Sequence, residues 1–292
     1  MNKCLFSNLR TNYHKKICAN IFAEKKVSTQ EITYNIADIS SKTSIEITNN
    51  MISKMGYSIR KKAPSSQASG SLLAQYTKEF LEEAFEHLQH IRPSKWNFTV
   101  SQAGKGIAAY DQYEHLFDLQ RLLDEKPEFK AALGGDYLIT PDIIISRYPL
   151  SDESINKNEF LVDKNDNVVG LTPLRFSNYN KPKGILHASI SCKWTIRSDR
   201  AQNTRTEALN LIRNRKGRTP HIVAVTFEPL LSRIASIAMG TGDVDCTYHC
   251  ALHELVEASN EVENDTQIDL LNTLIKGKRL RDISDLPFDL AI

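Results

Sequence analysis

The stretch that most constrains the fold is residues 185–227, where two β-branched runs flank an amphipathic segment. ILHASISCKW and HIVAVTF are typical of strands, and TRTEALNLIRNR between them has helical spacing. A strand–helix–strand unit favours a parallel pair of strands. A further β-branched run, DYLITPDIIISRY, precedes Pro149 and predicts a buried strand. The chain is therefore expected to adopt an α/β fold.

Other segments show helical or loop patterns. Helices are predicted at 5–22, after a short strand or loop within 31–55, and over 71–90. Another is predicted over 112–133, broken at Pro127 and stopped by Gly134 and Gly135. Residues 61–71 and 150–184 are expected to be loops. The chain after residue 231 predicts a strand, a helix over 245–260, a helix over 266–276 and a tail.

Charge and cysteine content limit the class of protein. The 292 residues suffice for one large domain or two ordinary ones, and the net charge of +2 indicates no general polyanion binder. Residues 193–218, however, hold eight basic side chains against Asp199 and Glu207, so a basic surface must be local. Five cysteines without a disulfide-like pattern, and no signal or membrane segment, predict a cytoplasmic protein.

Three residues on these elements suggest phosphate chemistry. Asp142 stands at the start of a predicted strand, Lys193 ends another, and Glu207 lies near the start of the following helix. Two carboxylates offer hard oxygen ligands for magnesium, and a lysine can stabilise charge on a phosphate. The spacing is a loose variant of the PD…(D/E)xK nuclease pattern, with Ser191 where the second acid usually stands. The alternative is a buried Asp142 capping a strand beside a surface Lys193–Glu207 pair.

Two further groups of side chains allow more than one interpretation. Arg197, Asp199 and Arg200 can read G and C bases, since arginine pairs with guanine O6 and N7, but they also suit phosphate contacts or a surface ion-pair loop. The segment CTYHCALHE spaces Cys246, His249, Cys250 and His253 along one face of the predicted helix. One helical face cannot enclose a tetrahedral zinc ion, so core packing is favoured over a zinc site.

Several long motifs point to a known family. The runs LHASISCKWTIRSDRAQN, NLIRNRKGR, ITPDII, NEFLVD, EHLQHIRP and GKRLRDISDLPFDLA closely resemble the NgoMIV-like type II (type IIF) restriction endonucleases of the PD-(D/E)xK superfamily. The resemblance covers nearly the whole chain. It implies a single restriction-endonuclease-like domain over residues 1–292, with a central mixed β-sheet flanked by helices.

The resemblance also implies roles for individual residues. Asp142, the backbone carbonyl of Cys192 and Glu207 would hold Mg²⁺, and Lys193 would position the attacking water. Arg197, Asp199 and Arg200 would read a central CCGG, Arg233 the outer base pair, and Gln67 the minor groove. The enzyme would be a homotetramer that binds two sites, with the loop at 150–184 in the oligomer contacts.

Two positions depart from the family pattern. A family glutamate aligns with Ala74, with Glu79 the nearest acid on that helix, and the family's aspartate for the outer base pair has no clear match, leaving Thr29 or Glu31 as candidates. The expected activity is that of a prokaryotic restriction–modification enzyme that cuts GCCGGC after the first G and leaves 5′ overhangs. The alternatives are a sequence-specific DNA-binding protein with weakened or lost cleavage, and a small-molecule enzyme with zinc at Cys246–His253.

Overall fold

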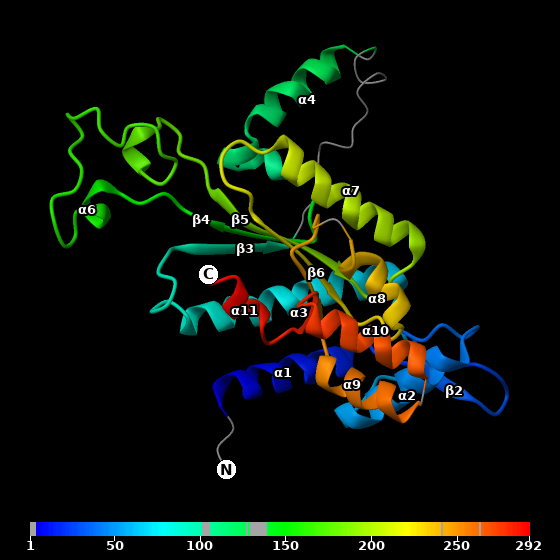
Figure 1. The fold of residues 1–292 in the computed structure, drawn as a ribbon. Helices are drawn as coiled ribbons and strands as arrows, with labels where there is room; N and C mark the ends of the chain where they lie inside the picture. The colour runs from blue at the N-terminus through cyan, green and yellow to red at the C-terminus, as the bar shows by residue number, and fades with distance from the viewer. Residues whose placement is uncertain (1–3, 101–105, 127, 129–138, 241, 263) are drawn as a thin grey trace. The chain divides into compact units, whose positions relative to one another are not determined.

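In the part of the chain that the structure describes, the larger of the two β-sheets has six strands and includes most of the strands predicted above. A computed structural model describes residues 4–292 except 101–105, 127, 129–138, 241 and 263; of residues 198–200 it describes only the backbone. The strand order is β3-β4-β5-β6-β7-β8, and its antiparallel and parallel pairs make it a mixed sheet flanked by helices (Figure 1). The expected α/β class with a central mixed sheet is confirmed.

The chain divides into two compact units. The first comprises Met1–Arg92, Ile190–Ala208 and Ile222–Ile292, and the second Pro93–Ser189 and Leu209–His221. Strand β5 (Ile185–Lys193) and helix α7 (Ser198–Asn214) contribute residues to both.

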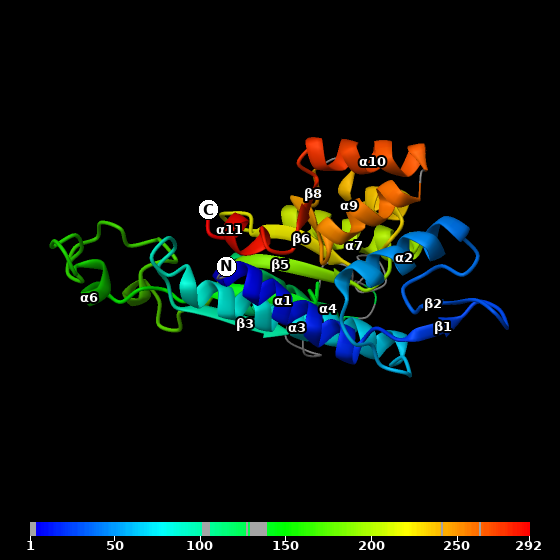
Figure 2. The same ribbon diagram turned by 90° about the horizontal axis from the view of Figure 1, so that it is seen from below.

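The N-terminal part of the first unit is mostly helical. It holds α1 (Leu5–Asn20), a hairpin of β1 (Glu24–Lys26) and β2 (Ile32–Tyr34), α2 (Lys42–Met55) and α3 (Ser66–His87). Helix α2 starts where Ser41 accepts a hydrogen bond from the Ser44 N–H and ends at Gly56, whose φ of 68° suits a residue without Cβ. Helices α1 and α3 lie side by side (Figure 2), and the Tyr13 hydroxyl is 2.9 Å from that of Thr77.

The remaining strands of the first unit run parallel. β6 (His221–Thr226) pairs with β7 (Cys246–His249), and β7 pairs with β8 (Leu280–Asp282). The helices of this region are α8 (Leu231–Ala238), α9 (Leu252–Glu261), α10 (Asp265–Lys276) and α11 (Leu286–Asp289). Helix α9 packs against α2, and α8 packs against α10.

The second unit is built on an antiparallel pair. β3 (Trp96–Val100) pairs with β4 (Ile143–Arg147), and short 3-10 helices at Ile107–Ala109 and Asp111–Tyr113 lead into α4 (His115–Glu125). The Gln112 amide donates to the Leu186 carbonyl at 2.7 Å and accepts from its N–H at 2.9 Å. This side chain therefore satisfies the backbone near the start of β5.

Four sequence-based boundaries were wrong. Residues 66–71, predicted as loop, are the first turns of α3, because Ser65 caps the helix by accepting from the Ala68 N–H. The segment predicted as a strand after residue 231 is helix α8, and residues 246–249 form β7 rather than helix. Short apolar runs fit either state by periodicity, and here the neighbouring β6 and β8 supply strand partners for 246–249. The predicted tail contains β8 and α11.

Two other predictions are refined. Every residue of β5 from Leu186 to Cys192 is buried, so the strand is covered on both faces rather than on alternate residues. The helix predicted over 112–133 is α4 from His115 to Glu125, and the predicted breaks at Pro127 and Gly134–Gly135 lie outside the described residues.

The long segment 150–184, called the arm below, belongs to the second unit and has internal order. It includes α6 (Asp152–Ile155) and a 3-10 helix at Phe176–Asn178. The buried Arg175 guanidinium donates to both carboxylate oxygens of Asp152 at 2.8 Å. The arm nevertheless leaves large apolar side chains in solvent, with Phe160 74% and Leu171 92% exposed. The arm therefore combines internal hydrogen bonds with exposed apolar side chains.

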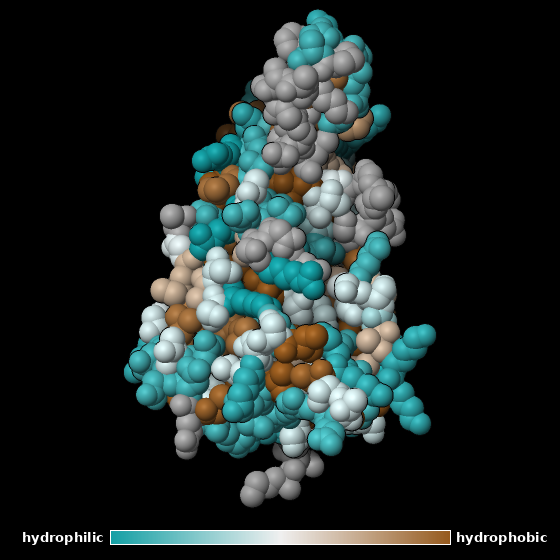
Figure 3. Space-filling view, turned by 90° about the vertical axis from the view of Figure 1, so that its right-hand side faces the viewer, coloured by the Kyte–Doolittle hydropathy of each residue, from teal (hydrophilic) through white to brown (hydrophobic). Residues whose placement is uncertain are grey.

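One face of the molecule is largely polar. Hydrophilic side chains cover most of the face in Figure 3, where the hydrophobic residues form small separate patches. None of the described helices combines the length and apolarity needed to cross a bilayer.

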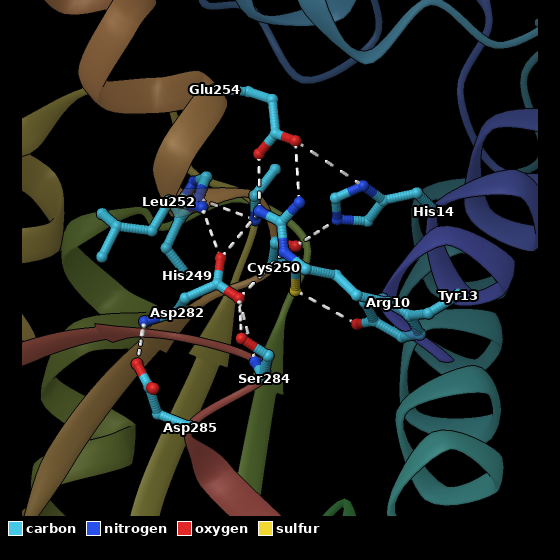
Figure 4. A network of polar contacts seen from close by, with 11 residues as sticks. Arg10, Tyr13, His14, His249, Cys250, Leu252, Glu254, Asp282, Ser284 and Asp285 are labelled. Atoms are coloured by element: carbon cyan, nitrogen blue, oxygen red, sulfur yellow. Dashed lines mark hydrogen bonds and ion pairs between the residues drawn. The ribbon is translucent and has the colours of Figure 1, made fainter. Parts of the chain in front are cut away.

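An ion network at Arg10 ties α1 to the C-terminal part of the first unit. The guanidinium donates to both oxygens of Glu254 on α9, at 2.8 and 2.6 Å, and to both oxygens of Asp282 on β8, at 2.9 and 2.8 Å (Figure 4). Asp282 also accepts from the N–H groups of Leu252 and Ser284. Burial acts to raise the pKa of Asp282, but Arg10 and Ser284 outweigh it and hold the pKa at about 2.

Arg10→Met should lower the free energy of unfolding by about 3 kcal/mol, because it leaves the buried carboxylate of Asp282 and the half-buried one of Glu254 without their cation. Urea unfolding at neutral pH measures this. Arg121→Met removes an exposed arginine with one long ion pair and should cost less than about 1 kcal/mol. Equal effects of the two substitutions would contradict a central role for Arg10.

The same network predicts an acid dependence. The pKa of Asp282 is lowered on folding from 3.8 to about 2, so its contribution to stability is complete above pH 3.8 and is lost as the pH falls toward 2. In Arg10→Met the stability difference from wild type should shrink over that interval.

Candidate functional site

The end of β5 is held by an aromatic cluster in the first unit. Trp194, directly after Lys193, lies 4.8 Å from Phe22 and 5.3 Å from Phe227 between ring centroids. Cys192 is buried, whereas Lys193 is half-buried and ends the strand. The packed indole therefore fixes the position from which the Lys193 side chain leaves the sheet.

The two predicted acids lie on different units. Asp142 immediately precedes β4 in the second unit and is half-buried, not fully buried as the alternative interpretation expected, so its charge keeps part of its contact with solvent. Glu207 belongs to the first unit and is also half-buried. It lies in the middle of α7 rather than near its start, because the helix begins at Ser198.

The predicted turn after β5 is shorter than expected. Residues 194–197 form the loop, and Asp199 and Arg200 already stand in the first turn of α7. Their side chains lie outside the described atoms. Arg197 remains in the loop and is exposed.

A pocket of about 690 Å³ opens in the first unit beside this loop. Its charged lining residues are Lys25, Asp38, Arg197 and Arg233, three cations and one carboxylate. Arg197 comes from the β5–α7 loop and Arg233 from the first turn of α8. The structure thus brings together two of the arginines predicted to contact DNA, and the pocket's charge suits an anionic, hydrogen-bonding ligand.

Asp38, in the loop before α2, is the residue that sequence reasoning missed. One carboxylate oxygen accepts from the Ser40 hydroxyl at 2.6 Å and its N–H at 3.0 Å, and the other pairs with Arg233. These bonds from Ser40, together with Arg233, lower the pKa of Asp38 to about 2. It is therefore a carboxylate at neutral pH, able to accept hydrogen bonds from a ligand.

A sequence signal for Asp38 did exist, since Asp-x-Ser-Ser before a helical run is typical of a capped turn. Thr29 and Glu31, the candidates considered from sequence, are exposed at the β1–β2 turn and do not line the pocket. Neither residue therefore shares the pocket with Arg233.

Helix α3 carries the remaining positions of interest in the first unit. Gln67 is exposed in its first turn, and Ala74 is buried. Glu79 accepts from the Lys16 ammonium at 2.7 Å and from Gln75 at 2.9 Å. These bonds occupy Glu79 on the helix surface, so we do not assign it the role of the family glutamate.

The Cys246–His253 segment does not form the helical face predicted from its spacing. Cys246 and His249 lie on β7, Cys250 is fully buried beside the Tyr13 hydroxyl, and His253 is exposed on α9. No group of three metal-binding side chains occurs among the residues that the structure describes. Core packing, favoured from sequence, accounts for the buried members.

Comparison with known proteins agrees with this arrangement. The model of the NgoMIV restriction enzyme family matches residues 13–292. The type II restriction enzyme NgoMIV of Neisseria gonorrhoeae is 48% identical over 293 aligned residues, covering 99% of each chain. With a restriction-endonuclease-type mixed sheet and an arginine-lined pocket beside the β5–α7 loop, the chain belongs to the NgoMIV restriction enzyme family and is a type II site-specific deoxyribonuclease.

Proposed function

We propose that this enzyme hydrolyses double-stranded DNA at the palindrome GCCGGC, cutting after the first G to leave 5′ overhangs and using Mg²⁺. The observation that carries the proposal is the pocket shared by Arg197, Arg233 and Asp38. Arg197 lies four residues after Lys193 in the chain, so a base-reading and a phosphate-directed side chain stand on one short segment.

The central CCGG is assigned to the segment that follows β5. Arg197 and Arg200 offer the two-pronged donor that matches O6 and N7 of guanine, and Asp199 can accept from the cytosine amino group. Asp199 and Arg200 belong to the first turn of α7, directly after the loop that carries Arg197. Gln67, exposed at the start of α3, is assigned to the minor groove.

The outer base pair is assigned to Arg233 and Asp38. An arginine and a carboxylate side by side present a donor pair and an acceptor, the complement of a G·C edge in the major groove. Asp38 replaces Thr29 and Glu31 as the residue proposed for this contact, because it lines the pocket with Arg233.

The donor set fits a hard divalent ion. Asp142 and Glu207 supply carboxylate oxygens, and Cys192 is assigned through its backbone carbonyl because its thiol side is buried in the core. Magnesium bound there would polarise the scissile phosphate and lower the pKa of a water. Restriction enzymes of this type generally use a divalent metal; the choice of Mg²⁺ is part of the proposal.

Lys193 supplies the protein's own cation at the reaction centre. Its ammonium orients the attacking water and stabilises the charge that develops on the phosphate. The rigid anchor at Trp194 limits the motion of the strand end that carries it. We assign direct attack by water, without a covalent enzyme intermediate.

The assembly is proposed to be a homotetramer that holds two DNA sites. The internally bonded arm exposes Phe160 and Leu171, and a second copy of this chain would cover such apolar side chains. Each subunit is proposed to be a single endonuclease domain acting in the prokaryotic cytoplasm, with a cognate modification enzyme.

Magnesium-dependent digestion followed by run-off sequencing should map breaks after the first G of GCCGGC. Breaks at another sequence would contradict the proposed recognition site.

Lys193→Ala should lose about a hundredfold or more of cleavage, because it removes a transition-state cation, while specific binding without metal is retained. Lys276→Ala, an exposed lysine at the end of α10, is the matched control. A Lys193→Ala variant that cleaves at the wild-type rate would show that Lys193 has no catalytic role.

Asp38→Asn should relax the outer base pair. The ratio of kcat/KM for GCCGGC to that for a site with an A·T outer pair should fall about tenfold, since the substitution exchanges an acceptor for a donor. Asp269→Asn, on the exposed face of α10, controls for loss of a carboxylate. An unchanged kcat/KM ratio in Asp38→Asn would show that other residues read the outer base pair.

Substituting Leu171 and Phe160 together by aspartate should convert tetramers to smaller species in sedimentation velocity experiments, because charge would be placed in the covered surface. Lys157→Ala in the same arm should leave the tetramer intact. Tetramers that persist in the double variant would exclude the arm as the contact.

A further inference from the structure

One fully buried carboxylate lies behind the pocket and is absent from the roles assigned above. Glu228, just after β6, has 0% of its surface exposed. Its Oε2 accepts from the Ile196 N–H at 2.7 Å, and its Oε1 accepts from the Leu230 N–H at 3.2 Å. A buried acid is retained at such a position only with compensating partners.

These two bonds reach both arginine-bearing segments of the pocket. Ile196 directly precedes Arg197 in the β5–α7 loop, and Leu230 is the N-cap residue of α8, whose first turn carries Arg233. The Arg233 guanidinium also lies 3.9 Å from the Glu228 carboxylate. A single side chain therefore fixes the loop of Arg197 against the helix of Arg233.

The hydrogen-bond pattern favours the ionised carboxylate. Both oxygens accept from backbone N–H donors, so an amide would direct a hydrogen at one of them, and a protonated acid would offer one of them a weaker hydroxyl acceptor. The neutral form therefore holds one of the two segments less strongly, and it also removes the negative charge behind Arg233.

The other titratable or charged groups around Glu228 come from three parts of the chain. Arg233 on α8 favours the ionised form, and Asp38 before α2 opposes it. His249 on β7 accepts the Ala251 N–H at Nδ1, so its Nε2 carries the proton toward the Glu228 carbonyl, 3.2 Å away. Burial lowers the pKa of His249 to about 4, so this ring is neutral near pH 7.

Burial dominates the titration of Glu228 itself. It raises the pKa from 4.5 to about 7, although the Ile196 and Leu230 N–H groups and Arg233 act in the opposite direction. Both protonation states of Glu228 are therefore populated near neutral pH. The charge of the carboxyl and its hydrogen bonds to Ile196 and Leu230 change together over a narrow pH range around 7.

We infer that Glu228 is a positioning residue for base readout, whose ionised carboxylate holds the Arg197 loop and Arg233 in the arrangement that binds specific DNA. The inference rests on the readout proposed above for Arg197 and Arg233. Protonation loosens the hold on one segment, and specific binding weakens without loss of the fold.

Stability and binding should respond to this group in opposite directions. Because the folded pKa is raised, Glu228 stabilises the fold fully below pH 4.5, and that contribution is lost as the pH rises through about 7. Specific binding, in contrast, should strengthen as the carboxylate ionises. A residue with only a structural role would change both in the same direction.

Glu228→Gln tests this by anisotropy with a GCCGGC duplex and a shuffled duplex, without metal and at fixed ionic strength. The ratio of variant to wild-type Kd for the specific duplex should rise from about one near pH 6 to about ten near pH 8, the effect of one charged hydrogen bond. A ratio that is constant with pH would overturn the inference. A wild type that does not distinguish the duplexes would instead refute the proposed readout.

Glu254→Gln is the control for a structural effect, since it weakens the Arg10 network away from the pocket. It should lower the melting temperature and leave the pH profile of binding as in wild type. If Glu228→Gln does not fold, hydrogen exchange of wild type supplies the test. The protection factor of the Ile196 amide should increase from about pH 6 to about pH 8, and a constant or falling value would contradict the inference.

Discussion

The ion network around Arg10 is the interaction on which the first unit depends. One guanidinium satisfies two carboxylates, and those carboxylates cap or join α1, α9 and β8. The polar contacts continue from this region through His249, which bonds the Ala251 N–H and the Glu228 carbonyl, to the loop that carries Arg197. Buried polar groups stabilise a fold only when each has its hydrogen-bond partner. Here such paired groups extend from α1 to the pocket.

This arrangement explains how a nearly neutral protein presents a site for a polyanion. The net charge is only +2, but Lys25, Arg197 and Arg233 line one pocket. The Arg233 guanidinium pairs with Asp38 and lies near Glu228, and the loop backbone next to Arg197 is held through the Ile196 N–H. Fixed cations lose less conformational freedom on binding, so local order contributes to recognition where global charge does not. Lys193, on the same segment, links the proposed reading and cutting functions.

Residues with strong local patterns were predicted well. The β-branched runs of β4, β5 and β6 and the long amphipathic α3 are apparent from periodicity, and the unusual motifs around SCK and RSDR identified the family. The errors fall where local pattern is ambiguous. Cys246–His249 and Leu231–Ala238 are short apolar runs, and their state depends on whether a strand neighbour is present. The catalytic and DNA-contact assignments of Asp142, Cys192, Lys193, Glu207, Arg197, Asp199, Arg200, Arg233 and Gln67 remain predictions.

The sequence alone determined the α/β class, the order of the main strands and helices, and the family, because these follow from spacing and from contiguous motifs. Tertiary structure decided which distant side chains share a surface. Asp38 and Arg233 are 195 positions apart, and Ile196 and Glu228 are 32 apart, so no local pattern could pair them. Their proximity depends on how the sheet and helices pack, and the ionisation of Glu228 depends on the burial that this packing produces.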